Sequence, residues 1–212
     1  MASGLLIIPV TSGSRDVLRV NARPGWLWRS PTLAIDASDA VRPVGRSLYD
    51  WPVLTLRSAV PADASQIVSY IRELAEFERE PEKAVVTEAD ILRYGFGEQP
   101  LDKVTMAEWD GAPAGVALWF LNFSTWEGKP GIYLEDLFVR PSFRGRGVGK
   151  ALLKHLASIA VQEGWTRFVW QVLDWNTPAI EFYQAHGARL MRSWLTCRVE
   201  GDAIARLAET PE

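Results

Sequence analysis

The sequence predicts an α+β fold, in which a mixed, mostly antiparallel central sheet is flanked by helices within a single domain. From Trp51 onward, strand-like and helix-like patterns alternate along the chain. Asp110-Gly111 separates two apolar runs and is a strong signal for a hairpin, whose strands pair antiparallel. An apolar strand, a glycine-rich loop and an amphipathic helix then follow one another over residues 132–159. These observations together favour a sheet with helices packed against it.

Length and composition fit an ordinary globular protein. The chain has 212 residues, of which 48% are hydrophobic, enough to fill a core. No apolar run approaches the roughly 20 residues of a membrane-spanning helix, so no membrane partner is expected. The single cysteine, Cys197, excludes an intramolecular disulfide and favours a reducing compartment, which makes a cytoplasmic location the expectation. A net charge of -3 without a local basic stripe argues against nucleic acid as a partner and suits a cationic substrate.

The composition changes near Asp50. Residues 1–50 contain six Arg and four Asp but no Lys or Glu, whereas residues 51–212 carry a net charge of -5. We therefore interpret residues 1–50 as an N-terminal extension, flexible or only loosely attached, and residues 51–212 as the folded domain. The Arg-rich start resembles a transit peptide, but its aspartates argue against that interpretation.

Two helices are predicted between the first strand and the hairpin. Apolar and polar residues alternate over Val53–Ser58, which predicts the first strand. Pro61 and Asp63 then open a helix that is expected to end near Glu80. A shorter helix, capped by its first residue, is predicted over Thr87–Arg93.

The remaining predicted elements build the sheet. The hairpin strands are expected at Val104–Trp109 and Val116–Phe123, with Ala112 and Pro113 lengthening the turn. Ile132–Val139 is apolar on both faces and is therefore expected to be a central strand. After the helix that begins at Val148, the patterns predict a strand at Phe168–Leu173, a short helix at Pro178–Ala185 and a last strand at Leu190–Val199.

The glycine-rich loop is a candidate phosphate site. Gly145, Gly147 and Gly149 alternate with Arg144, Arg146 and Val148 at the start of a helix and are followed by Lys150. Such a loop points backbone N–H groups outward, and the helix dipole and basic side chains favour an anion. By itself the pattern also fits a plain tight turn. Lys150 stands where a dinucleotide fingerprint needs its last glycine, and the lysine-hydroxyl pair of nucleotide hydrolases is absent, which disfavours nicotinamide and ATP sites.

Two motifs carry a resemblance to a known family. Arg144-x-x-Gly147-x-Gly149, after the strand Leu134–Val139, resembles the pyrophosphate-binding motif of the GNAT acetyltransferases. Trp175–Tyr183, followed by Gly187-Ala188, resembles the second motif of that superfamily. More narrowly, Glu73–Glu78, Gly95–Gly97 and Ile132–Asp136 resemble the spermidine/spermine and thialysine acetyltransferases. The resemblance covers about residues 54–208 and implies a GNAT-type sheet, acetyl-CoA as co-substrate, a small-molecule amine as substrate and a homodimer.

The resemblance also assigns residues to the site. It implies that acetyl-CoA is bound by Leu137, Phe138 and Val139, by Arg144, Gly145, Arg146, Gly147, Val148, Gly149 and Lys150, and by Asn176, Thr177, Pro178 and Ala179. It places the amine substrate near Phe77, Glu78, Trp126, Glu135 and Asp136. Asn176 also fits a helix N-cap, and both roles are compatible.

The chemistry of amine acetylation can be followed from the residues. An alkylamine has a pKa of about 10.4, so it arrives as an ammonium ion and must lose a proton before it attacks a thioester in a ternary complex. Glu135 is the candidate that holds the cation and relays its proton, if partial burial raises its pKa. Tyr183 is the candidate acid for the leaving thiolate, because a phenol pKa of about 10 matches it. The alternatives are that Glu135 is a solvated strand-edge acid or an ion-pair partner, and that Tyr183 is an aromatic of the core. No metal is expected, because neither His155 nor His186 stands in a ligand pattern.

The substrate stays open between several amines. Gly187-Ala188 leads to Trp194 through Arg189 and Arg192, where the polyamine enzymes carry an acidic stretch. We therefore expect short diamines or lysine-like amino acids rather than long polyamines. The alternatives are another primary amine, such as a protein amino terminus, or a non-catalytic acetyl-CoA sensor.

Overall fold

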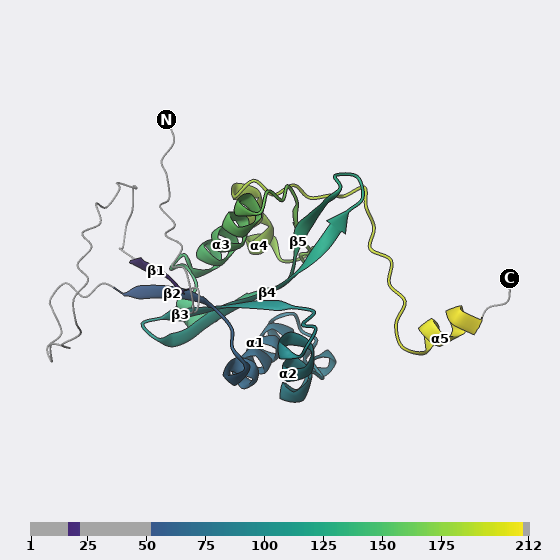
Figure 1. Cartoon of the computed structure of the whole chain (residues 1–212), viewed down its shortest axis with the longest axis horizontal. Coiled ribbons are helices and arrows are strands. Elements are labelled where there is room, and N and C mark those ends of the chain that lie inside the picture. Colours follow the sequence, from purple (N-terminus) through teal and green to yellow (C-terminus); the bar gives the residue numbers. More distant parts are fainter. Residues whose placement is uncertain (1–16, 22–51, 210–212) are drawn as a thin grey trace, which may run out of the picture. The chain divides into compact units, whose positions relative to one another are not determined.

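The sheet is the framework of the protein (Figure 1). The computed structural model describes residues 17–21 and 52–209. Six strands lie in the order β1-β2-β3-β4-β5-β6, with bounds Val17–Asn21, Val53–Ser58, Lys103–Trp109, Ala112–Ser124, Lys129–Val139 and Phe168–Trp170. The first five are antiparallel to their neighbours, and β6 is parallel to β5. The mixed, mostly antiparallel sheet that the sequence predicts is confirmed.

Helices lie on both sides of the sheet. α1 (Ala64–Phe77) and α2 (Glu88–Phe96) lie on one side, and α3 (Val148–Gln162) lies on the other (Figure 1). The chain divides into two units, one up to Gln171 and one from Val172 onward. The second unit holds α4 (Thr177–Ala185) and α5 (Asp202–Glu209). Across residues 17–21 and 52–209, no helix is both long and apolar enough to span a membrane.

The core lies on the two faces of the sheet. On the α1 side, a cluster of buried side chains consists of Ile67, Tyr70, Met106, Val116, Leu118 and Phe138. On the opposite side, α3 buries Val148, Leu152 and Leu156, the helical spacing that the sequence predicts. Each such side chain stabilises the fold by about 1.5–3 kcal/mol relative to exposure. This burial holds the strands that carry the site in place.

The β3–β4 turn is tighter than expected. Asp110 and Gly111 have φ values of 51° and 78°, as in a two-residue turn whose twist matches that of the strands. The Asp110 carboxylate also accepts a hydrogen bond from the Val53 N–H at 2.7 Å. Ala112 and Pro113 pair with Trp109 and Glu108 within the ladder, so the expectation that they lengthen the turn is wrong. An irregularity in the register between Ala107 and Glu108 accompanies the proline, which has no N–H to donate.

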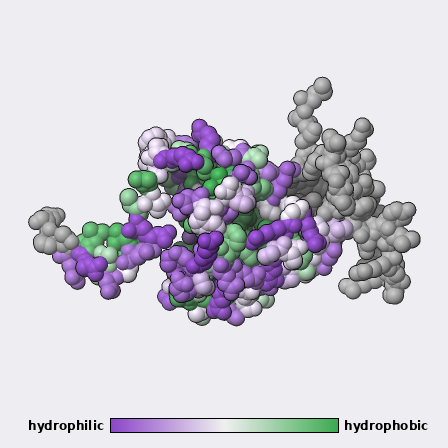
Figure 2. Space-filling model, turned by 180° about the vertical axis from the view of Figure 1, so that it is seen from behind, coloured by the Kyte–Doolittle hydropathy of each residue, from purple (hydrophilic) through white to green (hydrophobic). Residues whose placement is uncertain are grey.

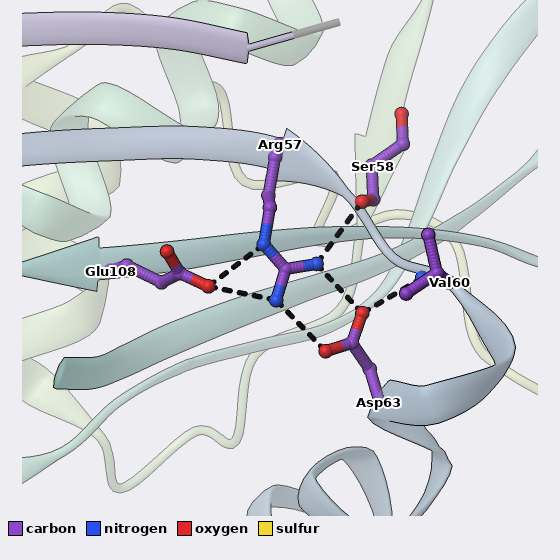
Figure 3. A network of polar contacts seen from close by, with 5 residues as sticks. All are labelled: Arg57, Ser58, Val60, Asp63 and Glu108. Carbon is purple, nitrogen blue, oxygen red and sulfur yellow. Dashed lines mark hydrogen bonds and ion pairs between the residues drawn. The ribbon is translucent and has the colours of Figure 1, made fainter. Parts of the chain in front are cut away.

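A network around Arg57 joins two strands to the start of α1 (Figure 3). The Arg57 guanidinium donates to both carboxylate oxygens of Asp63, at 2.7 and 2.8 Å, and to Glu108 at 2.7 Å. Asp63 also accepts from the Val60 N–H at 2.8 Å, so the residue that opens the helical segment is fixed to β2 and β3.

Three features differ from the sequence prediction. Residues 17–21 form β1, an edge strand paired with β2 that the sequence patterns did not predict. β6 ends at Trp170, where its pairing with β5 ends. Leu190–Val199 forms no strand, and no other strand lies within the described residues of the second unit to complete a ladder.

The C-terminal helix α5 was missed by the sequence reasoning. Ile204 and Leu207 lie one helical turn apart and are 57% and 65% exposed. In Figure 2, which is turned by 180° from Figure 1, the C-terminal segment shows both apolar and polar surface. The spacing of these two residues was a signal for the helix, although a short one.

Candidate active site

A bulge in β5 determines where its carboxylates point. Leu118 of β4 pairs with Asp136, whereas the next residue, Trp119, pairs with Leu134. Glu135 is therefore the extra residue of the bulge. Its side chain is exposed, and Asp136 faces the α1 side together with Phe138. The bulge thus separates two neighbouring carboxylates into different environments.

Beyond the bulge, one edge of β5 has no strand beside it. β6 pairs with Ile132, Tyr133 and Leu134 only. From Asp136 to Val139, β5 pairs with β4 alone among the strands that the structure describes. Backbone groups on the β6 side of this segment are therefore open to a ligand, except the Val139 carbonyl, which accepts from Arg144.

The glycine-rich loop begins α3 in a conformation that suits an anion. Gly145 and Gly147 have φ values of 72° and 84°, in the left-handed region that favours glycine, and Gly147 is the N-cap of α3. A Cβ at either position would meet no atom within 4 Å, so the loop surface is open. The first N–H groups of a helix have no partner within it, and here they begin beside exposed Lys150. Val148 is buried, which leaves only its backbone to contact a cofactor.

Arg144 joins this loop to β5 and to the end of α1. Its Nε donates to the Val139 carbonyl at 2.9 Å. Its guanidinium carbon lies 4.9 Å from the ring centroid of Phe77 and 5.9 Å from that of Phe138. Arg146 lies over the ring of Trp109 at 5.5 Å. The predicted cofactor loop is therefore adjacent to Phe77, a predicted substrate residue.

The turn after α1 fixes two glutamates. α1 is capped by Glu78, and the next residue, Arg79, adopts a φ of 65°. The Glu80 N–H then donates to the Ala75 carbonyl at 2.9 Å and the Arg79 N–H to the Glu76 carbonyl at 3.2 Å. This is the hydrogen-bond pattern of a Schellman motif, in which a left-handed residue closes the helix. Glu78 and Glu80 are thus held on either side of a defined turn.

A pocket of about 170 Å³ lies between this turn and β5. Its walls combine aliphatic and charged side chains, namely Ile71, Leu74, Ala75, Glu78, Glu80, Lys83, Ala84 and Asp136. Lys83 ends the short 3-10 turn Pro81–Lys83 that follows the Schellman motif. The pocket therefore has one wall from the end of α1 and the next turn, and one carboxylate from the sheet.

The pocket is electrostatically suited to a cation. Burial, with the charges of Glu135, Glu78 and Asp102, raises the pKa of Asp136 to about 7. Burial and the charge of Glu80 raise the pKa of Glu78. Carboxylates that resist ionisation in this way are stabilised in their charged form by an incoming cation. The pocket therefore binds a positively charged ligand more favourably than a neutral or negative one.

The structure brings some predicted substrate residues together and leaves others apart. Glu78 and Asp136 both line the pocket, and Phe77 is the residue before Glu78 in the chain. Glu135 is exposed, so the burial expected for it is found at Asp136 instead. Trp126 is 90% exposed in the β4–β5 turn, and Asp136 lies roughly 20 Å further along β5 at about 3.3 Å per residue. Within one chain, Trp126 is therefore distant from the pocket.

Sequence reasoning missed Lys83 and Asp102. Lys83 lines the pocket, and the charge of Asp102 contributes to the raised pKa of Asp136. The spacing of Glu80 and Lys83 was the one signal available for the first, since charges three residues apart often pair in a helical turn. Asp102 carried no such signal.

The second unit holds the other predicted residues. The Asn176 side chain accepts a hydrogen bond from the Ala179 N–H at 3.3 Å and caps α4, whose first turn contains Thr177 and Pro178. The N-cap role of Asn176 is confirmed. The Tyr183 ring lies 5.5 Å from that of Phe182, and burial raises the pKa of the Tyr183 phenol.

Comparisons with known proteins identify the family. The model of the acetyltransferase (GNAT) family matches residues 67–188. Thialysine N-epsilon-acetyltransferase of Sus scrofa is 37% identical over 164 residues, covering 72% of this chain and 96% of its own. L-ornithine N5-acetyltransferase NATA1 of Arabidopsis thaliana is 29% identical over 207 residues, covering 76% and 89%. A solved integron cassette protein from the mobile metagenome of V. cholerae has a TM-score of 0.64 at 30% identity, covering 74% of this chain and 98% of its own. The chain therefore belongs to the GNAT acetyltransferase family and is an N-acetyltransferase.

Proposed function

We propose that the protein transfers the acetyl group of acetyl-CoA to a primary amine of a small polyamine, diamine or lysine-like amino acid, by direct attack in a ternary complex. One observation carries this proposal. A pocket with three carboxylates includes Asp136 of β5, and beyond Leu134 no second strand among the described residues pairs with the β6 side of the same strand. Arg144 connects that strand to the glycine-rich loop. These features support an amine site and a cofactor site that adjoin along one strand.

Acetyl-CoA, the co-substrate of GNAT acetyltransferases, fits the residues present. Gly145, Gly147 and the first N–H groups of α3 form an open, positively polarised loop that would hold the pyrophosphate. The unpaired edge of β5 at Leu137–Val139 would hydrogen-bond the pantetheine amides and polarise the thioester oxygen. Asn176–Ala179 would add further contacts, as the resemblance implies.

The acidic pocket supplies what an ammonium substrate needs. Asp136 and Glu78 hold the cation. The pKa of Asp136, about 7, is closer to the pKa of an amine than the pKa of an ordinary aspartate is, which favours proton transfer between the two groups. Glu135 at the bulge is the second candidate for the proton relay, through water. When the amine nitrogen has bonded to the acetyl carbonyl carbon and the C–S bond breaks, Tyr183 gives its proton to the leaving thiolate.

A panel of amines assayed for coenzyme A release tests the proposal. We expect molecules with a primary amine and a second charged group to outperform monoamines, and added salt to reduce this advantage because it screens the pocket. The panel includes short and long diamines, lysine-like amino acids, monoamines and peptides. If monoamines match them or a peptide is the best substrate, the substrate class is wrong. If no amine causes thiol release, the protein is a non-catalytic acetyl-CoA binder.

Replacing Tyr183 by Phe tests the acid. The ring packing against Phe182 is kept and the proton donor is removed. We expect acetyl-CoA affinity to persist while kcat falls by about 10²-fold or more, the usual effect of losing a general acid. An unchanged kcat would assign Tyr183 to packing.

The resemblance also supports a homodimer in the cytoplasm. Trp126 is exposed and lies far from the pocket of its own chain, so in a homodimer it could contact the other subunit. Sedimentation of the purified protein at several concentrations tests the oligomeric state, and a species of monomer mass throughout would refute the dimer.

A further inference from the structure

The pocket contains an ion pair in addition to the carboxyl groups of Glu78 and Asp136. Lys83 Nζ lies 2.6 Å from Glu80 Oε1, and both residues line the pocket with Glu78 and Asp136. The pair lies at the more exposed part of the lining, since the Lys83 and Glu80 side chains are 67% and 52% exposed. Asp136 is the more buried carboxyl. The pocket therefore has an inner acidic group and an outer pair of opposite charges.

We propose that the Glu80–Lys83 pair recognises the head group of an α-amino acid substrate, with Lys83 binding the α-carboxylate and Glu80 the α-ammonium. The side-chain ammonium of the same substrate then lies at Glu78 and Asp136, where it is acetylated. This inference rests on the proposed function and narrows its substrate class to α-amino acids with a terminal amine, in preference to diamines. Lys83 is a specificity-determining residue in this scheme.

Charge complementarity carries the inference. A lysine-like amino acid has two ammonium groups and one carboxylate, and the pocket offers three carboxylates and one ammonium. Each ligand charge thus has a counterpart of opposite sign. A diamine brings only a second ammonium, whose attraction to Glu80 is offset by repulsion from the adjacent Lys83. The lining thus favours a head group of mixed charge.

The backbone holds the pair in position. The Lys83 N–H donates to the Glu80 carbonyl at 3.0 Å, and the Ala84 N–H donates to the Pro81 carbonyl at 3.3 Å. Pro81 restricts its own φ, and the Schellman motif fixes the chain just before it. The two charged side chains therefore extend from a defined turn, which lowers the entropy lost when a substrate binds.

Matched substrates that differ in a carboxylate test the proposal. Ornithine and putrescine, and likewise lysine and cadaverine, are pairs with and without that group. We expect the wild-type protein to prefer the amino acid of each pair. Lys83→Gln should lower kcat/KM for the amino acids by about five- to tenfold, less than for a buried charged hydrogen bond because Lys83 is 67% exposed, and leave the diamines unchanged or improved.

Two further variants separate this role from a general effect. Lys83→Arg keeps the charge and should retain the preference for amino acids. Arg72→Gln removes a positive charge from an exposed position of α1 outside the pocket lining and should change neither class. Thermal unfolding of each variant verifies that it is folded.

The outcomes are distinguishable. Equal losses for amino acids and diamines in Lys83→Gln would make Lys83 merely structural and overturn the inference. An unchanged ratio in that variant, with an active wild-type protein, would overturn it too. A wild-type protein that acetylates no amine would instead overturn the proposed function on which the inference rests.

Discussion

Burial of the Asp136 carboxyl destabilises the folded protein whenever that carboxyl is charged. Its pKa rises from an ordinary value of 3.8 to about 7 on folding. Between these pH values the unfolded chain has lost the proton and the folded chain still binds it, so the free energy of unfolding falls as the pH rises. Above about pH 7 both states are ionised, and the penalty stays constant. A residue held in this way is typical of a binding site that a cation completes.

Asp136→Asn should therefore gain stability relative to the wild-type protein as the pH rises from 4 to 7, and the gain should level off above pH 7. Thermal unfolding across this range measures it. Glu73→Gln is the opposite control, because the hydrogen bond from Arg140 lowers the Glu73 pKa. Glu73→Gln should be less stable than the wild-type protein at neutral pH, and the difference in the free energy of unfolding should shrink as the pH falls below about 4.5. Parallel pH trends in the two variants would contradict the assignment.

The identity of the buried carboxylate could not be predicted from the sequence. Glu135 and Asp136 are adjacent, and alternation along a strand says only that they point in different directions. The bulge, which arises from the register between β4 and β5, determines which one enters the pocket. Lys83 was missed for a related reason, since its place in the lining depends on how the turn after α1 folds back. The glycine-rich loop could be predicted because its left-handed conformation at Gly145 and Gly147 depends on the local glycines and not on distant parts of the chain.

Among the elements, the start of α1 depends on charges that are mostly removed from water. The Arg57 and Asp63 side chains are 20% and 13% exposed, and Glu108 is 25% exposed. Each carboxylate is satisfied by the same guanidinium, as Figure 3 shows. Removing one member of such a group leaves the others desolvated without compensation.

Arg57→Leu should therefore lower the free energy of unfolding by about 2–4 kcal/mol, somewhat less than a fully buried pair because some water reaches it. Arg198→Leu is the control. Its partner is Glu200 at 3.2 Å, but these side chains are 68% and 72% exposed, and such pairs contribute about 0–1 kcal/mol. Urea denaturation of both variants measures the difference, and similar losses would show that the Arg57 network adds little.

Gly147→Val tests the loop at the start of α3. A valine at a φ of 84° is strained, so Gly128→Val in the β4–β5 turn, at a φ of 63° and with equally open surroundings, serves as the control. Both variants should lose stability, but Gly147→Val alone should weaken the binding of coenzyme A, measured by calorimetry. The valine side chain at position 147 blocks the approach of the pyrophosphate to the backbone, whereas position 128 lies outside the loop. Intact affinity in folded Gly147→Val would remove the loop from the site.

On the scale of the whole molecule, the helices α1 to α4 and the central strands could be predicted well, whereas the peripheral strands and the C-terminal helix α5 could not. α1, α2 and α3 contain their own hydrogen bonds and show their buried face in the spacing of apolar residues. A strand requires a partner that the local sequence does not reveal. Val17–Asn21 became β1 because the edge of β2 pairs with it, whereas the alternating Leu190–Val199 has no such ladder.

The edge position of β1 leads to a prediction about truncation. Deleting residues 1–16 should leave the melting temperature unchanged, because β1 is retained. Deleting residues 1–50 removes β1 and should lower the free energy of unfolding by about 2–5 kcal/mol, since its ladder with β2 holds several backbone hydrogen bonds that each contribute about 0.5–1.5 kcal/mol. Cooperative unfolding and acetyl transfer should persist, because β3 and β4 separate β2 from the pocket strand β5.

The shorter chain should also associate more readily, because β2 then presents an unpaired edge. Thermal unfolding, thiol release and light scattering of the two truncated proteins measure these expectations. Equal melting temperatures for the two deletions would show that β1 does not stabilise the sheet. Loss of cooperative unfolding on removing residues 1–50 would show instead that the edge strand is needed to fold the domain.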